Sequence, residues 1–314
     1  MDNQLDSKLF INEKILESST EICNQFENAR PYKHVQLDNF FNENLIDRMI
    51  AEFPEPKKHE MFNEFGGPSL KHTVADVRSI GPAYRELDDY IASSSFKKLM
   101  GDLTGIDDLI YDSKYFGGGT HNNLSGQGMD PHVDFNYLDI SDVGKVHRRI
   151  NAIVYLNDEW DESWGGNLDL HSNPWDPASD QIIRVIPKKN RLILFETNEV
   201  SWHGFHPANS LLPKGATRKS FAIYMYTEDR PNHEIKPFHN TFYVPRIPLE
   251  SLRVGALVTQ EVVDELKAAR VKTLGLIQGI YGQEMALNQF IADRQYEINV
   301  LKSENNLLKK KLKI

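Results

Sequence analysis

The chain has 314 residues, of which 40% are hydrophobic and 26% charged, values typical of a folded protein with a sizeable core. Its formal net charge of −9 argues against broad nucleic-acid binding and against an anionic membrane surface as the main partner, because both require a basic footprint. Cys23 is the single cysteine, so no disulfide can form within the chain. The sequence has no apolar run near the roughly 20 residues that span a bilayer and no signal-peptide pattern at its N-terminus, so we expect a cytoplasmic location.

The N-terminal quarter of the chain is predicted to be mainly helical. Residues 1–35 are polar and form an expected N-terminal helical segment, with helix around Leu16 to Phe26. A short strand and a helix from about Asn42 to Phe53 should follow, and Pro54 ends that helix. Two more helices are predicted near Tyr84–Ser94 and Phe96–Thr104.

From about residue 107 to 227 the pattern changes to short apolar and β-branched runs separated by Gly, Asn, Asp and Pro. The runs are LIYDSKYF, RINAIVYL, NLDLH, QIIRVI, RLILFE and KSFAIYMYT. Many short strands with turn signals between them are typical of an all-β sandwich or barrel. We therefore expect one mainly β domain over residues 36–248, with flanking helices on its outside.

The C-terminal region is predicted to be helical, with a helical linker over residues 249–284 and a coiled-coil tail over 285–314. Heptad positions a and d fall on Ile291, Ile298, Asn305 and Leu312, and on Leu287, Arg294, Leu301 and Leu308. A polar Asn at an a position and the g–e′ pairs Glu297–Lys302 and Glu304–Lys309 are typical of parallel dimers. The prediction is a homodimer through the tail. The alternatives are a single exposed helix or a helix packed on its own domain.

A candidate metal site begins with the sequence Asp130-Pro-His132-Val-Asp134. On a strand, residues i and i+2 point to the same face, so His132 and Asp134 can offer an imidazole and a carboxylate to one ion. A third ligand can come from the segment SWHGFHP, either His203 or His206. We favour His203, because Gly204 permits a tight turn behind it, whereas Pro207 biases His206 toward an extended, loop-like backbone. Two histidines and one carboxylate on one face of an octahedral ion leave three open positions.

Arg218 begins the strand RKSFAIYMYT, downstream of the candidate ligands. Its guanidinium can hold a carboxylate with two parallel hydrogen bonds. Ser220 lies two residues further on and shares the same face, so its hydroxyl can join that contact. The alternative is a surface arginine at a strand end.

Taken together, these residues resemble the Fe(II)/2-oxoglutarate dioxygenase superfamily, and within it the prolyl-4-hydroxylase-like branch. The match covers roughly residues 107–228 and follows, in order, YFGGGTHNN, DPHVDFNY, RRINAIVYLNDEW, WGGNLDLH, IPKKNRLILFE, SWHGFHP and RKSFAIYMYT. The resemblance implies a double-stranded β-helix, also called a jelly roll. It also implies Fe(II), 2-oxoglutarate and O2, with ascorbate as a candidate reductant.

The resemblance assigns roles to individual residues. It implies His132, Asp134 and His203 as iron ligands, and Arg218 as the partner of the distal carboxylate of 2-oxoglutarate, with Ser220 matching an Arg-x-Ser pattern. Tyr155 matches the position whose phenol joins that arginine, and its alternative is a core tyrosine. Fifteen positions separate His203 from Arg218, more than in many relatives, which keeps His206 open as the third ligand. The carboxylate of Asp134 favours hydroxylation over halogenation, because related halogenases have a small residue there.

The expected activity is hydroxylation of an unactivated C–H bond with release of succinate and CO2, and no general base is required. The substrate is either a peptidyl proline or a small polar molecule such as a sugar or amino acid. The Gly-rich segment before His132 is a candidate lid, in which His121, Asn122 and Asn123 either contact a ligand or are turn residues. Asp161 to Gly166 is a candidate rim. The rival classes are an inactive or other-metal jelly-roll binding module and a coiled-coil adaptor.

Overall fold

The computed structural model describes residues 4–61, 69–141, 143–246, 252, 254–255 and 257–312. The chain divides into two compact units, Met1–Val244 and Pro245–Ile314. The predicted boundary between residues 248 and 249 lies outside the described residues.

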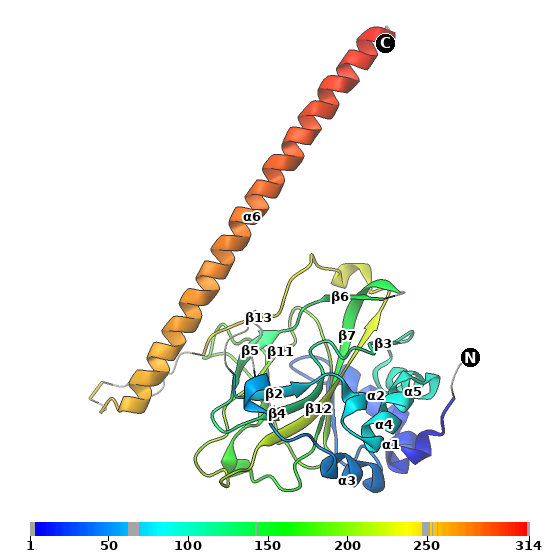
Figure 1. The fold of residues 1–314 in the computed structure, drawn as a ribbon, viewed down its shortest axis with the longest axis vertical. Helices are drawn as coiled ribbons and strands as arrows, with labels where there is room; N and C mark the ends of the chain where they lie inside the picture. Colours follow the sequence, from blue (N-terminus) through cyan, green and yellow to red (C-terminus); the bar gives the residue numbers. More distant parts are fainter. Residues whose placement is uncertain are drawn as a thin grey trace. The chain divides into compact units, whose positions relative to one another are not determined.

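The first unit is built on two antiparallel sheets (Figure 1). The larger sheet has the order β1-β10-β7-β12-β4-β2, with β3 paired to β12 and β6 paired to β7, and the smaller has the order β13-β5-β11-β8-β9. The strands of the larger sheet are β1 (His34–Leu37), β2 (Lys71–Val74), β3 (Ile110–Tyr111), β4 (Gly119–Asn123), β6 (Tyr137–Ile140), β7 (Gly144–Tyr155), β10 (Leu192–Glu196) and β12 (Arg218–Thr227). Those of the smaller sheet are β5 (Met129–Val133), β8 (Leu168–His171), β9 (Ile182–Val185), β11 (Trp202–Phe205) and β13 (Phe242–Tyr243).

Five α-helices precede most of the strands, and side-chain caps define several of their ends. They are α1 (Glu13–Glu17), α2 (Ser19–Asn28), α3 (Glu43–Ala51), α4 (Pro82–Ala92) and α5 (Ser94–Thr104). The side chains of Asn42 and Ser93 accept hydrogen bonds from the first turns of α3 and α5, and Gly105 ends α5 with a φ of 69°. Short 3₁₀ helices occupy Ser7–Leu9, Lys58–Glu60, Val77–Ser79, Glu162–Trp164 and Asn232–Glu234.

The two faces of the larger sheet contact different layers, because side chains alternate along each strand. On one face, Ile150, Ala152 and Val154 of β7 join the main apolar core with residues of α2 to α5, such as Phe26. On the other face, Tyr155 packs in a second cluster with residues of the smaller sheet. The first unit is therefore a helix layer and two facing sheets, which fits a jelly-roll-like fold with flanking helices.

Most predicted elements are present. Five of the six apolar runs form strands of four residues or more, whereas LIYDSKYF contributes only the two residues of β3. The candidate lid differs from the expectation, because residues 119–123 form β4, which is paired on both sides with β12 and β2. Asn122 and Asn123 are buried strand residues, not turn residues. The predicted N-terminal segment lies in the first unit, and Ile22 contributes to its main core.

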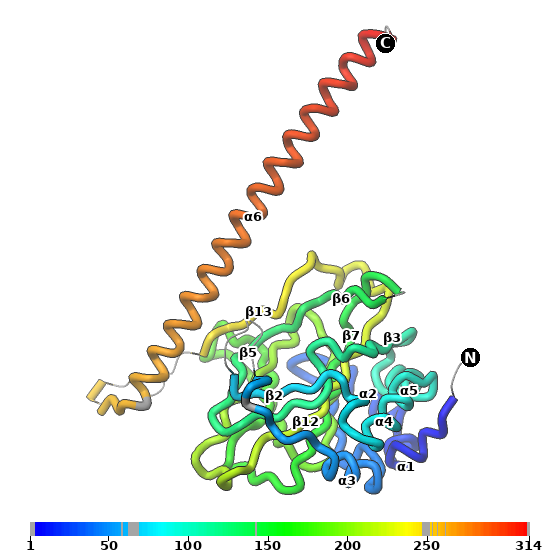
Figure 2. The backbone as a smooth tube through the Cα atoms, viewed as in Figure 1, coloured from blue at the N-terminus to red at the C-terminus, as the bar shows by residue number. Residues whose placement is uncertain are grey.

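The second unit is dominated by one helix, α6 (Gln260–Leu312), of 53 residues. Figure 2 traces it without interruption, so the predicted junction between residues 284 and 285 lies inside a continuous helix. Its aliphatic a and d residues are largely solvent-exposed. Within the described part of the chain, no helix combines the length and apolarity needed to cross a membrane.

Candidate metal centre

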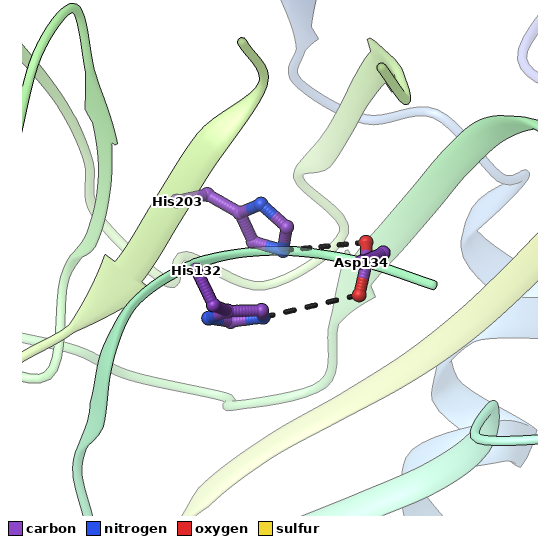
Figure 3. A group of neighbouring side chains, drawn as sticks. All are labelled: His132, Asp134 and His203. Atoms are coloured by element: carbon purple, nitrogen blue, oxygen red, sulfur yellow. Dashed lines mark ion pairs between the residues drawn. The ribbon is translucent and has the colours of Figure 1, made fainter. Parts of the chain in front are cut away.

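Two histidines of the smaller sheet face each other across neighbouring strands. β5 and β11 are antiparallel, and His132 lies directly opposite His203 in their register. Opposed residues of antiparallel strands project from the same face of the sheet, so the two rings come together, with centroids 4.2 Å apart. Figure 3 shows both imidazoles beside the carboxylate of Asp134.

Asp134 completes the cluster from a position one residue beyond the end of β5. Its Oδ2 atom lies 3.6 Å from His203 Nε2, and its Oδ1 atom lies 3.9 Å from His132 Nε2. One donor atom from each residue lies within 4.8 Å of the others, so the three can hold one metal ion. The alternation of side chains along a strand predicted that His132 and Asp134 lie on the same side. The structure places them together, although β5 ends at Val133 and Asp134 follows it.

Hydrogen bonds fix the protonation of both imidazoles. His132 Nδ1 lies 2.9 Å from the carbonyl oxygen of Asp130, and His203 Nδ1 lies 2.9 Å from that of Ser201. A carbonyl oxygen only accepts, so each Nδ1 carries the proton and each Nε2 keeps a lone pair toward Asp134. Burial lowers the pKa of both histidines, to about 3 for His132. Both rings are therefore neutral near pH 7, the form that binds a metal.

Asp134 is ionised despite its burial. Burial by itself would raise its pKa, but Arg148, together with the two imidazoles when they become protonated at acid pH, outweighs that effect and lowers the pKa to about 2. Two neutral imidazoles and one carboxylate on one side of a site are the ligand set of Fe(II) oxygenases. The residues present therefore fit Fe(II).

Arg218 lies in the interior between the two sheets, at the start of β12. Its Nε donates to the carbonyl oxygen of Gly166 at 2.7 Å, and its Nη2 lies 3.1 Å from the hydroxyl of Tyr155. The guanidinium carbon is 4.3 Å from the ring centroid of Phe205, which lies two residues after His203 on β11. Residues i and i+2 of a strand share a face, so Arg218 reaches the same side of the smaller sheet as His203.

Ser220 lies opposite Tyr155 in the pairing of β12 with β7, and both residues are buried. The structure thus brings Arg218, Tyr155 and Ser220 into one group, as their positions in the sequence suggested. Tyr155 is fully buried and its hydroxyl contacts the guanidinium, so it is more than a packing residue.

The alternative third ligand, His206, is placed differently. Its side chain is 62% exposed, and its Nε2 lies 3.9 Å from Oδ2 of Asp169, not beside His132. The long loop between β11 and β12 therefore does not displace His203 from the other two residues. The candidate rim is also partly structural, because Asp161 caps the 3₁₀ helix at Glu162–Trp164.

Three residues near the cluster were not identified from the sequence. Arg148 and Asn151 of β7 contact the carboxylate of Asp134. Their signal was an arginine and an amide beside and within the apolar run at residues 150–155 of β7, because such side chains are unusual at buried positions. Tyr243 lies opposite His132 in the pairing of β13 with β5, with ring centroids 5.1 Å apart. A strand of two residues gives no sequence signal of its own.

Comparison with known proteins gives matches over the central part of the chain. Residues 119–226 match the model of the 2OG-Fe(II) oxygenase superfamily. The prolyl 3-hydroxylase OGFOD1 of Mus musculus is 31% identical over 134 residues, which are 40% of this chain and 23% of the mouse protein. The chain thus spans less than a quarter of that relative.

Solved structures of prolyl hydroxylases are also similar. A prolyl 4-hydroxylase from Phytophthora capsici has a TM-score of 0.45 and 17% identity, covering 72% of this chain and 68% of that one. A prolyl hydroxylase from Trichoplax adhaerens, in complex with a hypoxia inducible factor peptide fragment, has a TM-score of 0.45 and 15% identity, covering 69% and 94%. Residues 119–226 of this chain are thus similar to the 2OG-Fe(II) oxygenase superfamily, both by the family match and by the sequence relative.

Proposed function

We propose that this chain is an Fe(II)- and 2-oxoglutarate-dependent dioxygenase that hydroxylates an unactivated C–H bond. His132, Asp134 and His203 would hold the iron. Arg218 would bind the distal carboxylate of 2-oxoglutarate, and Tyr155 and Ser220 would support that contact.

One observation supports the proposal most directly. The buried guanidinium of Arg218 lies on the same interior surface as the buried candidate metal ligands. Phe205, which contacts Arg218, lies two residues from His203, a spacing of roughly 7 Å along a strand. That separation suits a short dicarboxylate with one end at the metal and the other at the guanidinium. A jelly roll that only binds a partner would need neither the ligands nor the cation.

When bound, iron and 2-oxoglutarate would supply the oxidation, in which 2-oxoglutarate and O2 would give succinate, CO2 and one oxygen atom that enters the C–H bond as a hydroxyl. The protein's part is to bind, orient and keep the site dry. Nδ1–H of each histidine donates to a backbone carbonyl, which fixes the ring plane and leaves Nε2 free to ligate. The burial of Arg218 strengthens its attraction for a carboxylate, because little water competes for it.

The substrate we favour is a peptidyl proline. The mouse relative is named a prolyl 3-hydroxylase, and this supports a prolyl residue over a small polar molecule. An aromatic cluster near the metal ligands is compatible with a peptide, since Trp175 and Phe242 are both exposed and their ring centroids are 5.8 Å apart. Aromatic surfaces of this kind bind extended, proline-containing segments in other proteins.

The test is anaerobic addition of Fe(II) and then 2-oxoglutarate to metal-free protein, monitored for the weak visible charge-transfer band of the chelate. His203→Ala and His206→Ala are compared with the wild type. We expect a band that only His203→Ala abolishes, because His206 lies outside the cluster. The matched pair of variants separates loss of a ligand from general damage to β11 and the residues that follow it.

A folded wild type that binds another divalent metal but gives no band would contradict the proposal and favour an inactive or other-metal jelly roll.

A second experiment tests turnover by succinate release with proline-containing peptides and, separately, with free amino acids and sugars. Release that depends on peptide would support the prolyl assignment, whereas release with the small molecules alone would overturn it.

We further propose that α6 forms a parallel homodimeric coiled coil. A helix of 53 residues extends over about 80 Å and cannot be sustained in water by propensity alone, so it needs a packing partner. Upstream of the predicted tail the same heptad places Ile277 at a and Ile280 at d, both more than half exposed, with the charged Glu284 at the a position between them and the tail. Arg294 at a d position makes an ion pair with Glu297 at 2.9 Å, which moderates the charge at the expected seam.

Sedimentation equilibrium of the full chain tests this proposal. We expect a dimer at micromolar concentration, and a monomer in a chain shortened to residue 276. A monomeric full chain would contradict the coiled coil without affecting the metal centre.

A further inference from the structure

A one-residue bulge in β7 changes which side chains face the metal ligands. In the pairing of β7 with β12, Tyr226 lies opposite Arg148 and Met225 lies opposite Ile150, so Arg149 is an extra residue. In a regular strand Arg148 and Asn151 would point to opposite faces, because they are three positions apart. The bulge reverses the alternation once, so both side chains face the interior between the sheets.

The two side chains meet at one oxygen of Asp134. Asn151 Nδ2 donates to Asp134 Oδ2 at 2.8 Å, and Arg148 Nη2 lies 3.2 Å from the same oxygen. The amide oxygen of Asn151 accepts from Arg148 Nε at 3.1 Å and Nη2 at 2.7 Å. Arg148 therefore fixes the amide so that its NH2 group faces Asp134.

The guanidinium of Arg148 is itself held firmly. Arg148 is only 2% exposed, and its guanidinium carbon lies 3.7 Å from the ring centroid of Tyr224 and 4.5 Å from that of Phe135. Cation–π contacts and the charge of Asp134 together offset part of the cost of burying this cation. Its direction of approach to the carboxylate is thus set by packing.

The contacts of the Asp134 carboxylate differ from those expected of an ion pair whose role is stability alone. A structural Arg–carboxylate pair is often bidentate, with one donor for each carboxylate oxygen. Here the Asn151 amide and the Arg148 guanidinium both contact Oδ2, which also lies 3.6 Å from His203 Nε2, whereas Oδ1 has His132 Nε2 at 3.9 Å as its neighbour within the cluster. Each oxygen thus faces one histidine of the cluster, but Asn151 and Arg148 both contact Oδ2 and not Oδ1.

We propose that Arg148 and Asn151 are positioning residues that hold Oδ2 of Asp134 so that the carboxylate ligates through Oδ1 alone. This inference rests on the proposed function. Three single-atom protein ligands leave three positions of an octahedral ion open, as a chelating keto acid and O2 together require. A carboxylate that bound through both oxygens would take one of those positions.

The experiment uses the full chain loaded with Mn(II) and measures the number of exchangeable metal-bound waters by water-proton relaxation, before and after 2-oxoglutarate. The variants Arg148→Met and Asn151→Leu remove the donors with limited change in volume. Lys145→Met removes an exposed cation from the same strand and is the matched control, and Arg148→Lys keeps a donor that can reach Oδ2.

We expect about three exchangeable waters in the wild type, the control and Arg148→Lys, and about two in Arg148→Met and Asn151→Leu. Mn(II) affinity should fall about 10- to 100-fold in the last two, as is usual when partners of a metal ligand are lost. If Arg148→Met does not fold, Asn151→Leu decides the question alone. Variants with the wild-type number of waters would overturn the inference, whereas a wild type that binds no metal would overturn the proposed function as well.

Discussion

The change Arg218→Met tests the proposed co-substrate pocket by removing its cation and leaving its bulk. Arg218 is 5% exposed, and burial lowers its pKa. Among the described residues, its hydrogen-bond partners are the Gly166 carbonyl and the Tyr155 hydroxyl, and neither is an anion. A buried guanidinium without a carboxylate is expensive in free energy, which is reasonable if a ligand supplies the missing charge.

The magnitude follows from the bonds that would be lost. A hydrogen bond to a charged group contributes about 1.5–3 kcal/mol, so a two-bond Arg–carboxylate contact contributes roughly 3–6 kcal/mol. At about 1.4 kcal/mol per tenfold change, the Kd for 2-oxoglutarate should rise roughly 100- to 10,000-fold. Metal affinity without 2-oxoglutarate should stay within about threefold of the wild type, because Arg218 is not among the three candidate ligands.

Anaerobic titration calorimetry of 2-oxoglutarate into the metal-loaded protein measures this effect. Lys219→Met is the matched control, because Lys219 is the next residue of β12 and points to the opposite face. The free energy of unfolding without ligand should change by only about 1–2 kcal/mol, since removal of a buried cation offsets two lost hydrogen bonds. An undiminished affinity for 2-oxoglutarate in folded Arg218→Met would remove Arg218 from the site and refute the reasoning.

Three other predictions concern residues that are not candidate ligands. Gly204→Ala should weaken metal binding and lower the melting temperature. A Cβ at this position would lie 2.7 Å from the carbonyl oxygen of Met129 and would force β5 away from β11. An unchanged Mn(II) affinity of this variant would contradict the prediction. The hydrogen bond to Glu199 raises the pKa of His239, so its stabilising contribution is complete below about pH 6.5 and is lost as pH rises through the raised value. Hydrogen exchange of residues 236–243, corrected for the intrinsic rate, should therefore increase from pH 6 to 8 in the wild type and stay flat in His239→Gln. Asn305→Leu should raise the oligomeric state or loosen the register of the α6 dimer in sedimentation and cross-linking, and an unchanged dimer would argue that Asn305 does not lie at its seam.

The sequence predicted that His132, Asp134 and His203 lie together, because the signals for this grouping are short-range or chemically unusual. The spacing of His132 and Asp134 places them together whether the second residue ends the strand or follows it. Choosing His203 over His206 required only the local effects of Gly204 and Pro207. The role of Arg218, an arginine at the start of a strand, was ambiguous when taken alone. Its assignment to the site depended on its position in the chain relative to the candidate ligands.

Other features depend on which strands pair, and no local pattern encodes that. The Gly-rich segment suggested a lid, yet residues 119–123 form a central strand because β12 and β2 supply partners on both sides. Tyr243 reaches His132 through a pairing of two residues with an edge strand. Such contacts join residues from 46 to 111 positions apart, so they appear only when the sheet is assembled.

The bulge at Arg149 shows why a strand pattern can be read correctly and still mislead. From a strict alternation, Arg148 would share a face with Ile150 and Ala152, on the side of the helices, where a charged group would be hard to accommodate. The extra residue moves Arg148 to the opposite face, next to Asp134, and leaves Arg149 to pair with Glu196 at 3.1 Å. Two adjacent arginines thus find separate carboxylates on opposite faces of one strand. Two polar residues that break the alternation expected of a strand are therefore better taken as a sign of a bulge than as an error in the strand assignment. The residue that the bulge turns toward the other face is the one to examine for function.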